Sequence, residues 1–282
     1  MFELAAGIGI ALILIAFLAE YVDSTLGMGY GTTLTPLLMM LGFEPLQIVP
    51  AVLLSELITG LLAGFTHHSM GNVEFFPNTI RFTTVLKRLK YVPTKKGIQR
   101  GWAKLPVHLR ITLVIALCSI VGTVLSVFLA LNLPAFYVKL YIGMLVLAIG
   151  VVILATMKAQ FRFSWLRIIG LGMLASFNKG ISGGGYGPVV TGGQLLAGVQ
   201  GKNAIGITSL AEGLTCIVGV VAYLAVGTGL DWTLAPYLCI GAVLSVPLSC
   251  MTVRIMSAVR LRIGIGIFTL LLGAYTLWKL LF

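Results

Sequence analysis

The sequence predicts an all-α polytopic membrane protein built from two related halves, and three observations lead to this fold class. Hydrophobic residues make up 59% of the 282-residue chain, charged residues make up 10%, and the mean hydropathy is +1.06. A soluble core of this size needs far less apolar sequence, so lipid is the expected solvent. Long apolar runs recur along the chain, and a glycine motif occurs twice among them. Together these features predict about eight to ten membrane segments, arranged as two inverted-topology repeats of about five helical segments each.

Ten apolar segments follow one another along the chain. They are residues 4–22, 31–42, 46–66, 108–131, 136–157, 165–178, 187–198, 203–224, 234–253 and 261–281. Eight of them are long enough, or nearly so, to cross a hydrocarbon core of about 30 Å as helices. The second and the seventh are too short to cross unaided, and each follows the glycine motif directly. Short, glycine-interrupted segments at matching places in two halves indicate discontinuous or re-entrant helices, and both forms remain open.

The glycine motif recurs at an offset of 156 residues. The run Leu-Gly-Met-Gly-Tyr-Gly-Thr-Thr-Leu-Thr-Pro begins at Leu26, and Ser-Gly-Gly-Gly-Tyr-Gly-Pro-Val-Val-Thr-Gly begins at Ser182. A weaker match, at an offset of 123, aligns the fifth apolar segment with the tenth. We therefore expect a first repeat over residues 1–157 and a second over 158–282. A basic insertion at about residues 72–107 of the first repeat accounts for the change of offset.

The basic residues are concentrated in that insertion. Nine of the nineteen Lys and Arg residues lie between Arg81 and Arg110, and the net charge of the chain is +11. In a soluble protein this charge would suggest nucleic acid, but here the positive-inside rule and anionic lipid headgroups explain it better. The insertion is then cytoplasmic, and both termini face outward with the loops around Glu44 and Asp231. Lys139 is the one contrary charge.

Enzymatic and metal-binding functions have no support in the sequence. Nothing resembles a metal site, a pairing of nucleophile and base, or a phosphate-transfer motif. The four cysteines lie in apolar segments without a CxxC pair, which is typical of small core residues. They are Cys118, Cys216, Cys239 and Cys250. We therefore expect a protein that is not an enzyme and needs no cofactor.

The two glycine motifs are the candidate substrate site. Glycine lets the backbone turn sharply, and the first N–H groups of a helix that starts there would be unpaired at the positive end of its dipole. Such an end attracts anions without a full positive charge. The alternative is close packing of helices, which also favours small residues. The candidate substrate-binding residues are Gly27, Gly29, Tyr30, Gly31, Gly183, Gly184, Gly185, Tyr186, Gly187 and Lys179.

Two glutamates occupy equivalent positions in the middle of long apolar segments. Glu56 and Glu212 are separated by the repeat offset, and Thr59 and Thr215 follow three residues later on the same helical face. A charge inside a membrane is costly, so such acids usually face a cavity and have a function. Because burial disfavours the ionised form, they could carry protons for coupled transport. The alternative is a structural role, with each protonated glutamic acid hydrogen-bonded to a neighbouring helix.

A few further polar residues could line a pathway. Asp23 and Lys179 are equivalent in the two repeats and could form an ion pair, or Lys179 could face an anionic substrate while Asp23 tunes it; Glu20 could compete for Lys179. His67 could accept a proton or touch an anion, or face headgroups as a boundary residue. Other candidates for the pathway are Asn178, Ser182, Gln194, Thr208 and Ser209.

The chain resembles the sulfite exporter TauE/SafE family of membrane permeases, which includes toluene-sulfonate uptake permeases. The resemblance lies in the duplicated glycine motifs and in the stretches 51–71 and 204–227, each followed by an acidic-aromatic pair. The family pattern is usually GxGGG, and the first copy departs from it as Gly-Met-Gly-Tyr-Gly. The resemblance implies a multi-pass protein of the cell membrane that transports a small sulfur-containing anion such as sulfite, a sulfonate or sulfoacetate.

Several alternatives remain open at this point. The chain could be a secondary transporter working by alternating access, with or without proton coupling, and its substrate could be another small organic anion. An anion channel could use the same glycine-lined pathway. The expected partners are the anionic substrate and membrane lipid rather than nucleic acid, and a homo-oligomer is a further alternative.

Overall fold

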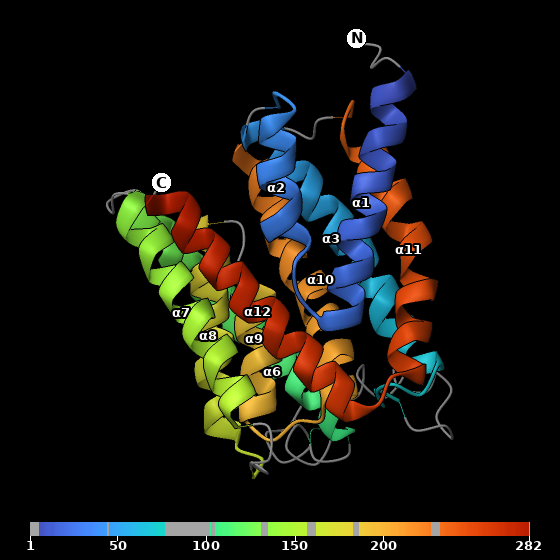
Figure 1. Ribbon diagram of the computed structural model, residues 1–282, viewed down its shortest axis with the longest axis vertical. Helices are drawn as coiled ribbons and strands as arrows, with labels where there is room; N and C mark the ends of the chain where they lie inside the picture. Colours follow the sequence, from blue (N-terminus) through green and yellow to red (C-terminus); the bar gives the residue numbers. More distant parts are fainter. Residues whose placement is uncertain are drawn as a thin grey trace, which may run out of the picture.

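The protein is a bundle of α-helices, shown in Figure 1 as a computed structural model. The structure describes residues 6–43, 45–76, 102, 105–130, 135–156, 162–182, 186–226 and 232–281. Within these ranges it contains ten main helices and no strand. They are α1 (Ala6–Leu26), α2 (Tyr30–Met40), α3 (Pro45–Ser69), α6 (Val107–Ala130), α7 (Ala135–Ala155), α8 (Trp165–Ser182), α9 (Tyr186–Leu196), α10 (Gly201–Val226), α11 (Ala235–Ile255) and α12 (Ala258–Leu281). The all-α class is confirmed, and each of the ten predicted segments forms a helix.

The helices fall into two length classes. α2 and α9 have 11 residues each, which corresponds to about 16 Å, roughly half of a hydrocarbon core. Five helices are long and apolar enough to cross a membrane, judged by length and composition, and they are α1, α3, α10, α11 and α12. α6, α7 and α8 contain shorter apolar stretches. Of the eight segments predicted to be long, five therefore qualify as spans among the described residues.

The helix boundaries repeat at the offset found in the sequence. α2 begins at Tyr30 and α9 at Tyr186, while α1 ends at Leu26 and α8 at Ser182. Each of these pairs is separated by 156 residues. A helix begins and ends where its backbone hydrogen bonds do, so this agreement extends the repeat from the residue types to the local structure.

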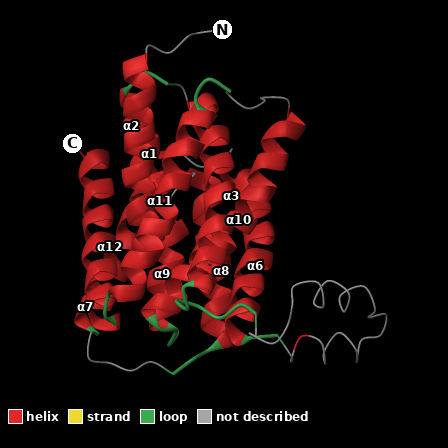
Figure 2. Ribbon diagram, turned by 90° about the vertical axis from the view of Figure 1, so that its right-hand side faces the viewer, coloured by secondary structure: helices red, strands yellow, loops and turns green. Residues whose placement is uncertain are grey.

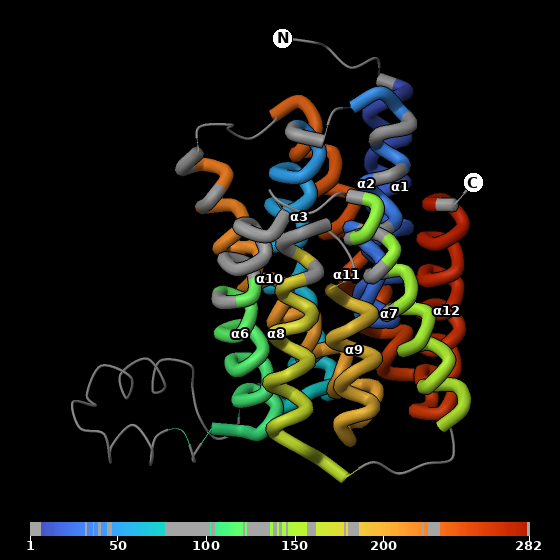
Figure 3. The backbone as a smooth tube through the Cα atoms, turned by 90° about the vertical axis from the view of Figure 1, so that its left-hand side faces the viewer, coloured from blue at the N-terminus to red at the C-terminus, as the bar shows by residue number. Residues whose placement is uncertain are grey.

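The two short helices occupy opposite halves of the bundle. α1 and α2 run antiparallel, and α2 lies toward the end where the N-terminus is found (Figures 1 and 3). α8 and α9 are likewise antiparallel, but α9 lies toward the other end (Figures 2 and 3). That other end also carries the C-terminal ends of α3, α7 and α11 and the N-terminal ends of α6, α8, α10 and α12.

Most described basic side chains lie near those helix ends. Arg110 is in the first turn of α6, Arg167 in that of α8 and Lys202 in that of α10, while Arg254 is in the last turn of α11. The basic charge is therefore collected at one end of the bundle, as the positive-inside argument requires. Of the predicted insertion, residues 77–101 and 103–104 lie outside the described residues, and so does the side chain of Lys139.

The polarity of the bundle is that of a protein surrounded by lipid. In α1, Leu14 and Leu18 are 56% and 62% exposed, whereas Glu20 and Asp23 are buried. Large apolar side chains of α10, α11 and α12 are exposed in the same way. Apolar side chains therefore face outward and acidic ones face inward, which is the favourable arrangement when the solvent is hydrocarbon.

Helices α7 and α12 pack through reciprocal contacts of glycine with leucine. A Cβ atom added at Gly143 would lie 2.7 Å from Cδ2 of Leu277, and one added at Gly266 would lie 2.7 Å from Cδ2 of Leu154. Gly143 and Gly266 are separated by 123 residues, as are Leu154 and Leu277. Exchanging the two helices thus converts one contact into the other.

Helices α3 and α10 cross at a point where their backbones touch. A Cβ atom at Gly60 would lie 2.7 Å from the amide nitrogen of Gly213 and 2.7 Å from the carbonyl oxygen of Ser209. Glycine is therefore required at Gly60 for the helices to approach so closely. Glu56 is one turn before Gly60, and Glu212 is adjacent to Gly213, so the crossing brings these two acids together.

Candidate functional site

A buried lysine binds both of the equivalent glutamates. Lys179, in the last turn of α8, lies with its Nζ atom 3.0 Å from Oε2 of Glu56 and 2.7 Å from Oε1 of Glu212. All three residues are buried. We call Lys179, Glu56 and Glu212 the ion triad. It joins α3 of the first half to α8 and α10 of the second.

The predicted ion pair between Asp23 and Lys179 is wrong. Lys179 is held by the two glutamates instead. Asp23 uses Oδ1 to accept a hydrogen bond from the backbone N–H of Tyr30, at 3.1 Å. Glu20 does not compete for Lys179 either, because it accepts from the hydroxyls of Ser24 and Thr59, at 2.5 and 3.1 Å. Equivalence by the repeat does not imply contact, since a twofold relation can place matched residues on opposite sides of its axis.

The ammonium group of Lys179 also touches the start of the second short helix. Its Nζ atom lies 5.1 Å from the centroid of the Tyr186 ring, within the range of a cation–π contact. Tyr186 is the first residue of α9. The ammonium group thus lies between two carboxylates and this ring. Lys179 therefore links the acids to the second glycine motif.

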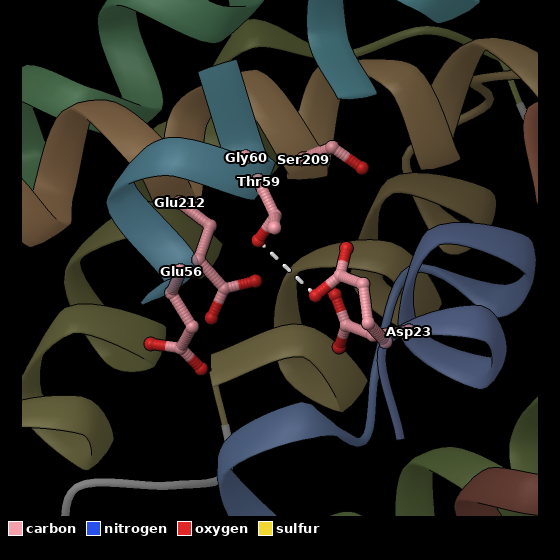
Figure 4. A pocket seen from close by; sticks show the side chains of 7 residues that line it. Asp23, Glu56, Thr59, Gly60, Ser209 and Glu212 are labelled. Carbon is pink, nitrogen blue, oxygen red and sulfur yellow. Dashed lines mark hydrogen bonds between the residues drawn. The ribbon is translucent and has the colours of Figure 1, made fainter. Parts of the chain in front are cut away.

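A small cavity of about 10 Å³, room for about one water molecule, lies beside the ion triad. It is lined by Glu20, Asp23, Glu56, Thr59, Gly60, Ser209 and Glu212. Figure 4 shows Glu56 and Glu212 on one side of it and Asp23 on the other, with Thr59 between them. Four carboxyl groups around one cavity make it a poor place for an anion.

The first glycine motif forms a tight turn before α2. Gly27 and Gly29 have φ angles of +74° and +126°, which disfavour any residue with a side chain. The turn ends at Tyr30, whose N–H is taken by Asp23 and whose hydroxyl lies 2.7 Å from Ser55 Oγ. The N-terminus of α2 therefore already holds a carboxylate of the protein itself. The predicted exposure of unpaired amides does not apply to the N–H of Tyr30.

The second motif touches the first. A Cβ atom at Gly187 would lie 2.6 Å from Cα of Met28 and 2.7 Å from the carbonyl oxygen of Gly27. The hydroxyl of Thr191 donates a hydrogen bond to that same carbonyl, at 2.7 Å. The start of α9 is thus packed against the turn before α2, so both motifs lie in one region of the bundle. Gly183, Gly184 and Gly185 lie outside the described residues.

Comparison with known proteins identifies the family. The model of the sulfite exporter TauE/SafE family matches residues 12–85 and 95–276, which is nearly the whole chain. This chain belongs to that family. It is 25% identical over 276 residues to the "Probable membrane transporter protein YtnM" of Bacillus subtilis (strain 168), covering 93% of this chain and 80% of YtnM. No solved structure matches the chain.

Membership in the TauE/SafE family makes the protein a multi-pass membrane transporter and not an enzyme. Its ion triad then belongs to a transport protein, in which buried charged residues usually mark a pathway for substrate or protons. Within the ranges that the structure describes, no group of three or more His, Cys, Asp or Glu side chains could hold a metal ion.

His67 is part of the TauE/SafE scaffold and does not face headgroups. It is fully buried, with Nε2 3.1 Å from the carbonyl oxygen of Ser24 and Nδ1 2.9 Å from Nδ2 of Asn72. Asn72 also donates to the carbonyl oxygen of Cys250, at 2.9 Å. A neutral imidazole satisfies this arrangement, because Nε2 donates to a carbonyl while Nδ1 accepts from an amide. The prediction of a boundary histidine is wrong, and a proton on Nδ1 would oppose the Asn72 contact.

The remaining candidates divide between cavity and core. Ser209 lines the cavity, whereas Thr208 accepts a hydrogen bond from Gln194, at 2.8 Å, away from it. The side chains of Asn178 and Ser182 lie outside the described residues. The sequence reasoning missed Ser55 and Asn72, which fix Tyr30 and His67. Single hydroxyls and amides are frequent in membrane proteins and do not by themselves indicate a site. Only their closeness in sequence to predicted site residues, Ser55 to Glu56 and Asn72 to His67, could have indicated them.

Proposed function

We propose that this transporter moves a small sulfur-containing anion, of the sulfite, sulfonate or sulfoacetate class, by alternating access between two inverted halves, coupled to protons. The observation that carries the proposal is the ion triad. It places a buried cation between two protonatable groups and the first residue of α9, where helices of both halves meet. A transporter that couples an anion to protons needs such a junction.

Inverted topology is supported by the packing of α7 against α12. Their contacts are reciprocal, as Gly143 with Leu277 and Gly266 with Leu154. The two helices run antiparallel in Figure 1. A twofold axis that exchanges antiparallel helices is perpendicular to them, and for helices that cross a membrane this axis lies in the membrane plane. The halves 1–157 and 158–282 would then be inverted copies. Their short helices, α2 and α9, would lie toward opposite faces of the membrane.

The anion site that we propose is the start of α9 with Lys179. The positive end of a short helix and a nearby ammonium group suit a sulfonate or sulfite, and backbone contacts release the cargo more readily than a rigid salt bridge. Gly187 and Tyr186 would form its described wall, and the motif residues Gly183, Gly184 and Gly185, which lie outside the described residues, are proposed as substrate-binding from the sequence alone. The start of α2 would serve mainly as packing, since Asp23 caps it.

Flux measurements in proteoliposomes test the proposal. Purified protein is reconstituted, and uptake of radiolabelled sulfite, sulfoacetate, taurine and sulfate is followed with and without a pH gradient. We expect saturable uptake of at least one sulfur anion, accelerated when the side from which the anion enters is more acidic. Protein-free liposomes measure the passive leak of the anion. The Lys179→Met variant is the control that lacks the buried cation.

Two results would overturn the proposal. Absence of saturable uptake for the whole panel would remove the sulfur anion as substrate and favour another small organic anion. A conductance that does not saturate and shows no exchange would indicate an anion channel. Two further predictions are separate from this one. Binding of anionic headgroups by the basic insertion would be tested by detergent-free lipid exchange, and assembly into a homo-oligomer by light scattering.

A further inference from the structure

The ammonium group of Lys179 is already enclosed by two carboxylates and an aromatic ring. Its Nζ atom lies 3.0 Å from Glu56 and 2.7 Å from Glu212, and the Tyr186 ring covers it at 5.1 Å. An ammonium group donates three hydrogen bonds at most. Two carboxylates beside the ammonium group also repel an arriving anion, so Lys179 can bind one only if at least one carboxylate gives up its charge or its contact. Removing one partner from a buried ion pair is strongly unfavourable unless the remaining charge is neutralised.

Protonation of the glutamates provides that neutralisation. A protonated carboxyl group no longer attracts an ammonium group as an ion does, and it can donate its own hydrogen bond. Resting on the proposed function, we propose that Lys179 exchanges its carboxylate partners for the transported anion, and that each negative charge of the anion enters with one proton taken up by Glu56 or Glu212.

The charge of the ion triad sets this ratio. Two carboxylates and one ammonium group give a net charge of −1 in a buried site. A monoanion that enters with one proton leaves the total at −1, and a dianion that enters with two protons does the same. Any other ratio changes the charge of a region shielded from water, which is expensive. Two glutamates are enough for a dianion.

The other titratable groups around the triad do not fill this role. From α1, Asp23 caps α2 through the N–H of Tyr30, and Glu20 accepts from Ser24 and Thr59. From α10, the Cys216 thiol donates to Oε2 of Glu56, at 3.4 Å, and from α9 Tyr186 presents its ring. None of these groups forms a salt bridge to Lys179 among the described residues, so only Glu56 and Glu212 can release it by taking up protons.

Calorimetry in paired buffers measures the protons directly. The full chain in detergent is titrated with sulfoacetate, a dianion, and with methanesulfonate, a monoanion, in buffers that differ in ionisation enthalpy. We expect uptake of about two protons with the first probe and about one with the second. Glu56→Gln with Glu212→Gln should bind sulfoacetate without proton uptake and with an affinity that does not depend on pH. Each single variant should lose about one proton, which keeps the test available if the double variant does not fold.

Glu20→Gln is the matched control, because Glu20 lines the same cavity without touching Lys179. Its proton uptake should equal that of the wild type. Binding without proton uptake in the wild type, or unchanged uptake in the double variant, would overturn the exchange at Lys179 and leave the proposed transporter intact. If neither probe binds to the wild type and the flux panel is also negative, the proposed function itself fails.

Discussion

A short helix of matching length follows each of the two glycine motifs, but the residue at one equivalent position before the motifs differs in charge. α2 and α9 each have 11 residues and each start with a buried tyrosine, Tyr30 and Tyr186. Seven residues before the tyrosine, Asp23 precedes the first motif and Lys179 precedes the second. Asp23 caps its own helix, whereas Lys179 turns away to two glutamates. The two segments thus share a helix pattern, while the residue at the matching position caps the following helix in one and reaches two other helices in the other.

The tyrosine hydroxyls show the same difference. Tyr30 is held by a short contact of 2.7 Å to Ser55. The hydroxyl of Tyr186 lies 3.5 Å from both Ser119 and Thr215, at the limit of a hydrogen bond. Among the described contacts, the hydroxyl of Tyr30 is therefore held more firmly than that of Tyr186. A site that must accept and release a substrate is more easily built on the second motif.

The largest effect is expected from removing the cation of the second motif. Lys179→Met leaves two buried carboxylates without a cation beside them, which costs about 3–5 kcal/mol unless they take up protons. We expect loss of transport and a lower unfolding temperature at neutral pH. Combining Lys179→Met with Glu56→Gln and Glu212→Gln should restore the unfolding temperature and leave transport absent. Transport by the triple variant would show that the lysine is only structural.

The corresponding change in the first motif should affect stability alone. Asp23→Ala removes the cap of α2 and should lower the free energy of unfolding by about 1 kcal/mol. Asp23→Asn keeps an oxygen for the N–H of Tyr30 and should cost less. Neither variant should change the apparent affinity for substrate in proteoliposomes. A large loss of affinity in Asp23→Asn would mean that the first motif also binds the anion, and the contrast between the motifs would disappear.

The tyrosines offer a finer comparison. Tyr30→Phe loses a short buried hydrogen bond and should lower the free energy of unfolding by about 1 kcal/mol. Tyr186→Phe should cost clearly less, since its contacts are long and its ring still covers Lys179. Thermal unfolding of both variants in the same detergent measures the difference. Equal destabilisation would show that the two motifs are held equally tightly.

Much of the fold could be predicted, because hydrophobicity and repetition are written in the residue types. The ten helices, the two short ones among them and the matched positions of Glu56 and Glu212 all follow from the sequence. The partner of Lys179 could not be predicted in this way. Its salt bridges depend on the crossing of α3 and α10 at Gly60, where helices far apart in the sequence meet. Sequence equivalence suggested Asp23, whereas packing placed the two glutamates within reach.

The smallest effect is expected at His67, which tests whether any proton-linked step belongs to the first motif. His67 contacts the carbonyl oxygen of Ser24, in the last turn of α1 before that motif, and Asn72 on the other side. Its contacts suit a neutral ring that donates through Nε2 and accepts through Nδ1, so we expect it to take no part in proton coupling. We expect His67→Gln to lower stability through lost packing and to change the transport rate by less than about threefold, with the pH profile unshifted. The measurement is uptake of the preferred sulfur anion between about pH 5 and 8. The Glu212→Gln variant is measured in parallel, and its pH profile should flatten. A shifted pH profile in His67→Gln alone would assign the proton-linked step to the first motif. The first motif would then be the functional one and the second the structural one.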